Sequence, residues 1–477
     1  MRASLASSIA VTCAAVLALP VSLTVPAAAA APPAAASAQP PAPELPGSTQ
    51  SLPLRPLGAA SRSLGGGATP GEQGLTRRDV RPFSLVGVVW DDPAAPLHGT
   101  VQVRTRATGG GAWSQWQDVE THNEEHGADP DTAEGSARAR RGATAPLWVG
   151  DSDGVEIRVR GEETLPTGLR LELVDPGQAP GDPARAPEVA EPEAPAPRSR
   201  SAAIPAAAAA LGAAEAAASA VNAQLAPYGA AWIPALSKEE TELTVPNLPR
   251  TAQTAAEAQA APAAEAAPAA AAAKPYIGPR PKIITRKGWG ADESIREKGF
   301  VYTGTIKAAF VHHSATGNNY TCGKAPAVLR SIYRYHVLSS GWRDFGYNFA
   351  VDKCGNIYEG RAGGVAKPVL GAHTLGFNTN SMGIAVLGTF TKSNPPAAVV
   401  TAVARLTAWK LGLHGVNPKG TSYLVSGGGN LYKKGKKVKF NAIAGHRDGF
   451  ATECPGTRLY GKLGTARTSS AKYQGRP

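Results

Sequence analysis

Hydrophobic and polar residues alternate with a period of two over much of the region between residues 81 and 176. In residues 155–159 and 169–173, aliphatic residues are separated by charged ones. Because successive side chains of a β-strand point to opposite faces, this alternation is typical of strands with one buried face. It predicts a small all-β, sandwich-like domain over residues 81–176. Trp113 and Trp116 mark a further expected strand, and we expect their rings in the core, the alternative being a carbohydrate-stacking platform.

The pattern changes in residues 281–465, where short apolar runs alternate with segments of helical periodicity. Apolar residues recur every three or four positions in residues 328–338 and 402–413, which predicts two helices. Strands are predicted at residues 308–312, 347–352, 357–359, 383–387 and 442–445. Together these elements predict an α/β domain with a mixed central β-sheet flanked by helices. Residues 466–477 are expected to form a tail.

The remaining segments are rich in Ala, Pro and Gly. Residues 1–30 begin with Arg2, continue as an apolar stretch interrupted by Pro20, and end in small residues. This pattern predicts a cleavable signal peptide and therefore a secreted protein, the alternative being an uncleaved membrane anchor. Residues 31–80 are predicted to be a disordered leader, and residues 177–280 an Ala/Pro-rich linker, because neither can bury much apolar surface.

Charge is distributed unevenly along the chain. Residues 281–477 carry 28 basic and 8 acidic side chains, whereas residues 1–280 carry 21 and 29. A basic surface favours anionic partners, which include nucleic acids, acidic lipids and acidic wall polymers. Export removes nucleic acid from this set.

Three cysteines remain after the expected cleavage: Cys322, Cys354 and Cys454. An odd number in an oxidising compartment leaves one thiol that is free, intermolecular or a ligand. His446 lies seven intervening residues before Cys454, and His312 ends a predicted strand. Two His and one Cys suit zinc with an open fourth position for water. The alternative is a pair of core histidines and a thiol without a metal.

Several short motifs raise the weight of the metal hypothesis. They occur in the order Val-His-His-Ser (311–314), Tyr-His (335–336), Gly-Trp-Arg-Asp-Phe-Gly-Tyr-Asn-Phe (341–349), Gly-Asn-Ile-Tyr-Glu-Gly-Arg (355–361), Gly-Ala-His-Thr (371–374), Asn-Ser-Met-Gly-Ile (380–384), and Gly-His-Arg-Asp (445–448) followed by Cys-Pro-Gly (454–456). Residues 281–465 thereby closely resemble the peptidoglycan recognition proteins and the related zinc-dependent N-acetylmuramoyl-L-alanine amidases.

The resemblance implies a set of site residues. His312, His446 and Cys454 match the zinc ligands, Tyr347 matches a residue that stabilises the oxyanion, and Thr452 matches a Thr or Lys of active members. One departure concerns the general base, because some related bacterial amidases carry a Glu where Ala385 and Val386 follow Ile384 here. Proton transfer would then fall to Tyr347, Thr452 or water.

Further residues are expected around the substrate. His336 matches a residue at the wall of the peptide groove, with burial in the core as the alternative, and His373 matches a substrate contact. Arg361 is predicted to clamp a stem-peptide carboxylate in bidentate fashion, the alternative being a solvated surface arginine. The lysine-rich run at residues 433–439 is expected in an exposed hairpin that attracts anionic wall polymers.

Cys322 and Cys354 each follow a predicted strand, and we expect a disulfide between them. The alternative is two separate buried thiols. Such a bond would tie the segment after His312 to the segment that carries Tyr347, and Cys454 would stay available as a zinc ligand.

Together these features predict a secreted, cell-wall-associated zinc hydrolase that cleaves the amide between N-acetylmuramic acid and L-alanine of peptidoglycan. The protein is expected to be a monomer. Two alternatives remain: a non-catalytic peptidoglycan-binding module, and a zinc endopeptidase that uses the same groove.

Overall fold

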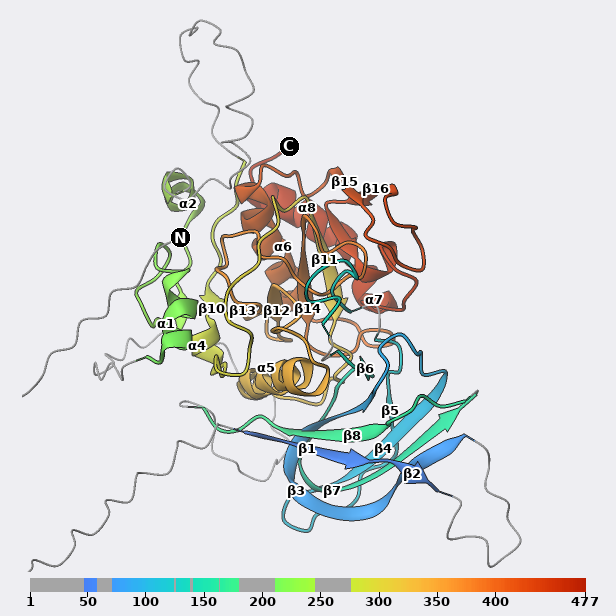
Figure 1. Ribbon diagram of the computed structural model, residues 1–477. Helices are drawn as coiled ribbons and strands as arrows, with labels where there is room; N and C mark the ends of the chain where they lie inside the picture. Colours follow the sequence, from blue (N-terminus) through green and yellow to red (C-terminus); the bar gives the residue numbers. More distant parts are fainter. Residues whose placement is uncertain are drawn as a thin grey trace, which may run out of the picture. The chain divides into compact units, whose positions relative to one another are not determined.

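The computed structural model describes residues 47–57, 71–123, 126–137, 140–162, 164–179, 211–244 and 276–477. The predicted signal peptide lies outside these ranges. Two large sheets are present in the described residues, one of eight strands and one of seven (Figure 1). None of the described helices combines the length and the hydrophobicity that a bilayer-spanning helix needs.

The β domain is built on the eight-stranded antiparallel sheet, with the order β1-β8-β3-β7-β4-β5 and with β2 and β6 paired to β3. The strands are β1 (Ser48–Pro53), β2 (Arg55–Pro56), β3 (Glu72–Trp90), β4 (Gly99–Ala107), β5 (Gln117–Val119), β6 (Gly142–Ala143), β7 (Leu147–Gly161) and β8 (Arg170–Asp175). Val101 and Val103 of β4 are buried between half-exposed polar residues, as the alternation predicts. The all-β prediction is confirmed.

The β domain begins earlier than the predicted boundary at residue 81. β1, β2 and the first half of β3 lie in the segment that was expected to be a leader. β1 pairs along its whole length with β8, although its residues are only half-buried or exposed. Backbone pairing rather than hydrophobicity forms this strand, which is why the sequence pattern does not predict it.

The two tryptophans do not enter the core. Trp113 forms an isolated bridge with Arg106, Trp116 directly precedes β5, and both rings are half-exposed. The Arg104 guanidinium lies over both rings, 5.8 Å and 4.8 Å from their centroids. Their packing is therefore with charged side chains on the surface of the sheet.

The C-terminal domain contains the seven-stranded mixed sheet, with the order β17-β11-β14-β12-β13-β10-β9. Its strands are β9 (Trp232–Ile233), β10 (Ile283–Ile284), β11 (Ala308–His313), β12 (Phe349–Val351), β13 (Ile357–Glu359), β14 (Ser381–Val386) and β17 (Ile443–Gly445). Figure 1 shows β10, β13, β12 and β14 side by side. The central strands β11 and β14 are buried along their whole length because helices cover both faces of the sheet.

Helices α6 (Ala397–Leu413) and α8 (Leu463–Tyr473) pack on one face, where Val403 and Leu406 join Val311 and Ile384 in one apolar cluster. Helix α5 (Ala325–Arg334), which continues as a π-helical turn at Tyr335–Ser339, packs on the other face. The remaining α-helices and strands of the described residues are α1 (Ala213–Ala220), α2 (Lys238–Thr244), α4 (Arg286–Trp289), α7 (Thr457–Tyr460), and the hairpin β15 (Thr421–Val425) and β16 (Lys437–Asn441). The mixed α/β prediction is confirmed.

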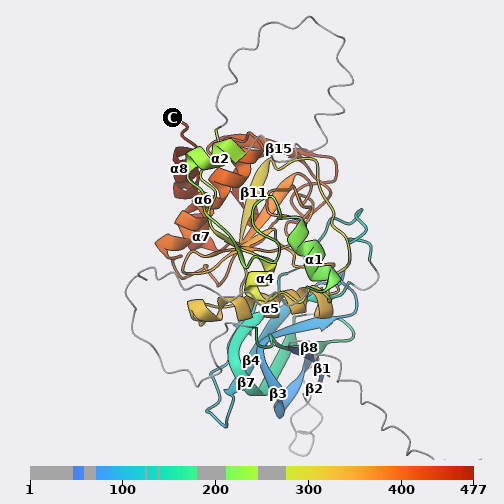
Figure 2. The same ribbon diagram turned by 90° about the vertical axis from the view of Figure 1, so that its left-hand side faces the viewer.

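Both boundaries of the C-terminal domain also differ from the prediction. α1, β9 and α2 fall inside the predicted linker, yet β9 pairs antiparallel with β10 and Ile233 is fully buried. Figure 2 shows α1 beside α4, where Lys287 pairs with Glu215 at 3.2 Å. At the other end, α8 extends through most of the predicted tail, and it buries Ala466 and Ala471. Of these elements only α1 is rich in alanine, whereas β9 is two residues long and α2 and α8 are largely polar, so none of them has a long apolar pattern.

The β domain packs against α5. Leu85, Val89 and Trp148 of the β domain belong to the same apolar cluster as Ile332 and Tyr335. The Tyr335 hydroxyl lies 3.3 Å from the carbonyl oxygen of Val88 and 3.1 Å from that of Thr144, and it donates a hydrogen bond there. We call this contact the α5 interface.

Candidate metal centre and its groove

Strand register brings two histidines together. β11 and β17 run parallel, and Val311 pairs with Gly445, so the residues that follow, His312 and His446, emerge at the same edge of the sheet. Their ring centroids lie 4.5 Å apart. A short 3₁₀ turn at His446–Asp448 and a returning loop bring Cys454 back, with its Sγ 3.8 Å from Nδ1 of His312. The three predicted zinc ligands therefore meet at one point.

A fourth residue completes this cluster. His126, in the β-domain segment between β5 and β6, has its ring centroid 4.5 Å from that of His446 and 5.4 Å from that of His312. The potential ligand atoms of His126, His312, His446 and Cys454 all lie within 4.8 Å of one another, and all four side chains are buried. The site therefore offers three imidazoles and one thiol.

This donor set fits zinc. Imidazole and thiolate are zinc ligands, whereas Mg²⁺ and Ca²⁺ require oxygen donors, and no carboxylate belongs to the cluster in the described residues. Burial lowers the pKa of His312 well below its ordinary value and that of His126 to about 3. Both imidazoles are thus neutral at physiological pH and present a lone pair.

The His373 ring is packed between Gly371 and Gly383, next to the ring of His312. A Cβ atom at Gly371 or Gly383 would come within 2.5 Å and 2.4 Å of its ring. Its Nδ1 is 3.0 Å from Oγ1 of Thr374, which is in turn 3.3 Å from Nε2 of His312. His373 is fully buried and reaches His312 through the Thr374 hydroxyl, which is a supporting position, and its contact with substrate stays a prediction.

A cavity of about 320 Å³ opens beside the cluster. Its wall includes the predicted residues Tyr347, Thr452 and His336 together with Cys454. The Tyr347 ring lies 5.2 Å from that of His312, and the His336 ring stacks on Trp342 at 4.3 Å. Oγ1 of Thr452 accepts a hydrogen bond from the Cys454 amide at 3.1 Å, which holds the loop that carries the thiol.

Comparison with known proteins identifies the family. Residues 302–457 match a family model described as N-acetylmuramoyl-L-alanine amidase, and residues 29–198 match one described as Rv3811 N-terminal galactose-binding domain-like. Peptidoglycan-recognition protein SC2 of Drosophila melanogaster is 30% identical over 185 residues, which are 38% of this chain and 85% of the relative. The chain belongs to the peptidoglycan recognition protein and amidase family.

Other relatives include human N-acetylmuramoyl-L-alanine amidase, which is 30% identical over 204 residues covering 41% of this chain and 30% of that protein. Among solved structures, Drosophila PGRP-LB is 28% identical, covers 38% of this chain and 92% of its own, and has a TM-score of 0.30. PGRP-LE in complex with tracheal cytotoxin, a monomeric diaminopimelic acid-type peptidoglycan, is 30% identical with the same coverage and TM-score. The family match supports peptidoglycan binding or amidase activity.

Arg361, the predicted carboxylate clamp of this family member, is buried and holds a carboxylate of its own chain. Its two terminal nitrogens donate to Glu134 of the β domain at 2.7 Å and 2.9 Å, and its Nε donates to the Phe345 carbonyl at 2.8 Å. Burial opposes ionisation of Glu134, but the charge of Arg361 outweighs burial and holds the pKa of that carboxyl below its usual value.

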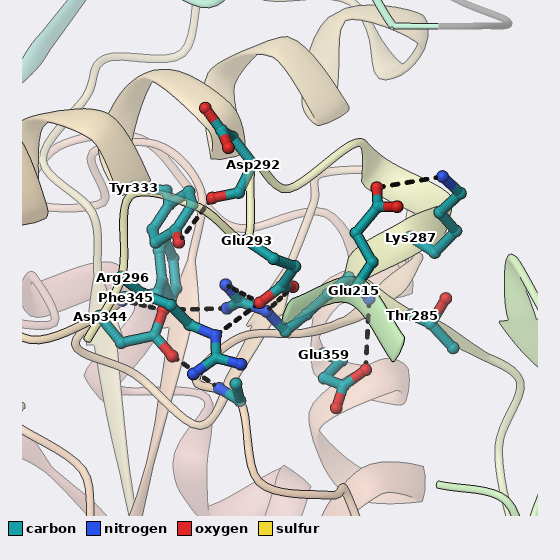
Figure 3. A network of polar contacts seen from close by, with 12 residues as sticks. Glu215, Thr285, Lys287, Asp292, Glu293, Arg296, Tyr333, Asp344, Phe345 and Glu359 are labelled. Atoms are coloured by element: carbon teal, nitrogen blue, oxygen red, sulfur yellow. Dashed lines mark hydrogen bonds and ion pairs between the residues drawn. The ribbon is translucent and has the colours of Figure 1, made fainter. Parts of the chain in front are cut away.

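A buried ion network supports the segments that carry Tyr347 and Arg361 (Figure 3). Arg286 pairs with Glu293 at 2.6 Å and with Asp344 at 3.0 Å. Asp344 also accepts hydrogen bonds from the amides of Phe345 and Ala362, at 2.7 Å and 2.8 Å. Phe345 lies two residues before Tyr347, and Ala362 directly follows Arg361. The network therefore holds the backbone next to both residues.

The predicted disulfide between Cys322 and Cys354 is present, with a Cα–Cα distance of 6.2 Å. It joins the turn before α5 to the turn after β12. Cys454 is not part of it.

The sequence analysis did not identify His126, Asp129 or Glu134. A signal was available, since residues 122–134 interrupt the β alternation with two histidines and several acidic residues. The negative charge of the acidic residues in this stretch also complements the basic residues of the C-terminal domain. We call residues 126–137 the inserted segment.

Proposed function

We propose that the chain is a zinc-dependent N-acetylmuramoyl-L-alanine amidase that hydrolyses the bond between N-acetylmuramic acid and L-alanine in peptidoglycan. The observation that carries this proposal is the buried cluster of His312, His446 and Cys454 beside Tyr347 and a cavity. A module that only binds peptidoglycan needs no thiol and no pair of convergent imidazoles. Bound zinc would polarise the scissile carbonyl and lower the pKa of a water molecule to about 7.

The chain's own residues divide the remaining work. The Tyr347 phenol, which lies against His312, donates a hydrogen bond to the developing oxyanion, a type of contact worth about 3–4 kcal/mol in other hydrolases. Ala385 and Val386, which stand where some relatives of this family carry a glutamate, are buried in β14 and carry no ionisable group. Proton transfer therefore falls to Tyr347, to Thr452 or to water in the cavity.

The proposed setting is the bacterial cell wall. The signal-peptide pattern of residues 1–30 supports export, and the excess of basic over acidic residues in residues 281–477 supports attraction to anionic wall polymers. We propose that the protein acts as a monomer on peptidoglycan and does not bind nucleic acid.

The test is digestion of purified peptidoglycan sacculi by the zinc-loaded full-length chain. New amino-terminal L-alanine without new reducing ends supports the amidase. Cys454→Ser should abolish this release, whereas His98→Ala, which changes an exposed histidine of the β domain, should retain it. Cleavage within the stem peptide would replace the proposal with an endopeptidase. Binding without any new ends, both in the wild type and in Glu134→Gln, would replace it with a recognition module.

A further inference from the structure

We propose that His126 is a fourth ligand of the metal and that the inserted segment is an internal plug of the groove. The β domain would thus hold the hydrolase in a latent state. The inference rests on the proposed function, but it concerns regulation of that site and has its own readouts.

The first observation is the position of His126. Catalytic zinc sites have three protein ligands and keep one position for water, whereas sites with four protein ligands are closed. Here His126 of the β domain lies close to the three predicted ligands. Its potential ligand atom lies within 4.8 Å of the potential ligand atom of each of them. With all four residues on the metal, His126 would occupy the position that a catalytic water needs.

The second observation lies at the other end of the inserted segment. Glu134 forms a buried bidentate pair with Arg361, the residue predicted to bind a substrate carboxylate. The same carboxylate accepts a hydrogen bond from the Arg343 amide at 3.2 Å. An internal carboxylate thus takes the place predicted for a carboxylate of the stem peptide.

Contacts between these two ends hold the segment in place. Asp129 accepts hydrogen bonds from the Gly376 amide at 2.7 Å and from the Asn378 side chain at 2.8 Å. The Gly127 carbonyl accepts another from the Asn378 side chain at 2.9 Å. Residues His126 to Asp129 are all buried. The segment therefore spans the site from the metal cluster to the carboxylate clamp.

The chemistry of these contacts makes them replaceable. A metal bond, a bidentate ion pair and hydrogen bonds can each be exchanged for water or for a ligand that carries the same groups. A peptide with a free carboxylate would compete with Glu134 for Arg361. Displacement of the plug would also withdraw His126 and leave three protein ligands on the metal.

The primary test is cobalt substitution of the full-length chain, followed by visible absorption spectroscopy. We expect one metal per chain in both the wild type and His126→Ala. In the wild type, added azide should leave the cobalt spectrum unchanged because four protein ligands close the site. In His126→Ala, azide should shift the spectrum, and the zinc dissociation constant should rise by about tenfold or more. His98→Ala is the matched control and should behave as the wild type.

A second variant acts at the other end of the plug without changing a proposed ligand. Glu134→Gln should also make the cobalt spectrum respond to azide, because the loss of the pair with Arg361 releases the segment. Both variants should hydrolyse soluble muropeptides about tenfold faster or more than the wild type. The Cys322–Cys354 disulfide and the circular dichroism spectrum of each variant report correct folding.

The outcomes separate this inference from the proposed function. An azide response of the wild type equal to that of His126→Ala would overturn the fourth ligand and the plug, even if the wild type is an active amidase. The expected spectral changes without hydrolysis in any variant would keep the plug and overturn the proposed function.

Discussion

The β domain meets the C-terminal domain in two regions of opposite chemistry. At the α5 interface the contact is apolar, since Leu85, Val89 and Trp148 share a cluster with Ile332 and Tyr335. At the inserted segment it is polar, and it consists of the Glu134–Arg361 pair, the hydrogen bonds of Asp129 and the approach of His126 to the metal cluster.

The two regions differ in how well water can replace their contacts when they open. Apolar surface gains about 25 cal/mol per Å² when it leaves water, and water cannot restore that gain if the contact opens. A hydrogen bond contributes only about 1 kcal/mol net, because water satisfies the same groups after opening. The two regions therefore suggest a permanent attachment at α5 and a reversible one in the groove.

The largest effect is expected at the α5 interface. Tyr335→Ala removes a fully buried ring and should lower the free energy of unfolding by about 3–5 kcal/mol. Denaturant titration followed by tryptophan fluorescence measures this change. Tyr335→Phe, which removes only the hydroxyl that lies near Val88 and Thr144, should cost about 1–2 kcal/mol. An equal loss in both variants would show that packing of the ring is not what joins the domains.

A smaller loss is expected from the opposite side of the same interface. A Cβ at residue 87 would lie 2.3 Å from the Tyr335 hydroxyl, so Gly87→Ala should cost about 1–3 kcal/mol through overpacking. Gly212→Ala is the control, because a Cβ there meets no atom within 4 Å. If the two substitutions had equal effects in thermal unfolding, the close approach of β3 and Tyr335 would be disproved.

Removal of a side chain in the inserted segment should lower the free energy of unfolding by less than a substitution at the α5 interface. Asp129→Ala removes the acceptor of two buried hydrogen bonds, but opening of the segment lets water reach the donors of Gly376 and Asn378, so the expected loss is about 1 kcal/mol. Amide hydrogen exchange should increase in residues 126–137 and stay unchanged in β3 and α5. A loss of about 3 kcal/mol or more would make the segment as fixed as the α5 interface and remove the contrast between them.

The smallest effect is expected at the outer side of the same segment. Asp131 pairs with Lys434 at 2.6 Å, but both side chains are more than half exposed. Lys434→Gln should change the unfolding free energy by less than about 0.5 kcal/mol, and the change should disappear at about 1 M salt. Lys433→Gln, in the same lysine-rich run, serves as the comparison. A large, salt-resistant effect of Lys434→Gln alone would mean that surface charge holds the segment.

Burial explains which parts of the fold could be predicted from sequence. β4 and β11 have patterns dictated by burial on one face or on both, so alternation and apolar runs identify them. β1 and β9 owe their conformation to the strands beside them, and neither has a pattern of its own. The residues of β1 and β9 themselves do not indicate which distant strand will pair with them.

The same distinction applies to the site. His312 and His446 lie at predicted strand ends and Cys454 in the loop that follows, all in one domain, and motif order and resemblance point to all three. Glu134 and Arg361 are 227 residues apart and come from different domains. Their meeting depends on how the β domain packs on α5, which neither segment encodes by itself.

The pairing of β9 with β10 has a consequence for dividing this protein into fragments. A fragment cut at the predicted boundary of residue 281 would retain β10 and its pairing with β13, but it would lose β9, which pairs with the other side of β10. It would also lose Asn222, whose side chain donates to the buried Glu359 at 2.8 Å. An unpaired, apolar sheet edge is a template for strands of other molecules, so such a fragment should aggregate during expression. A fragment that begins near residue 211 keeps this edge covered, but it exposes the apolar α5 interface, so a stable fragment must also contain the β domain.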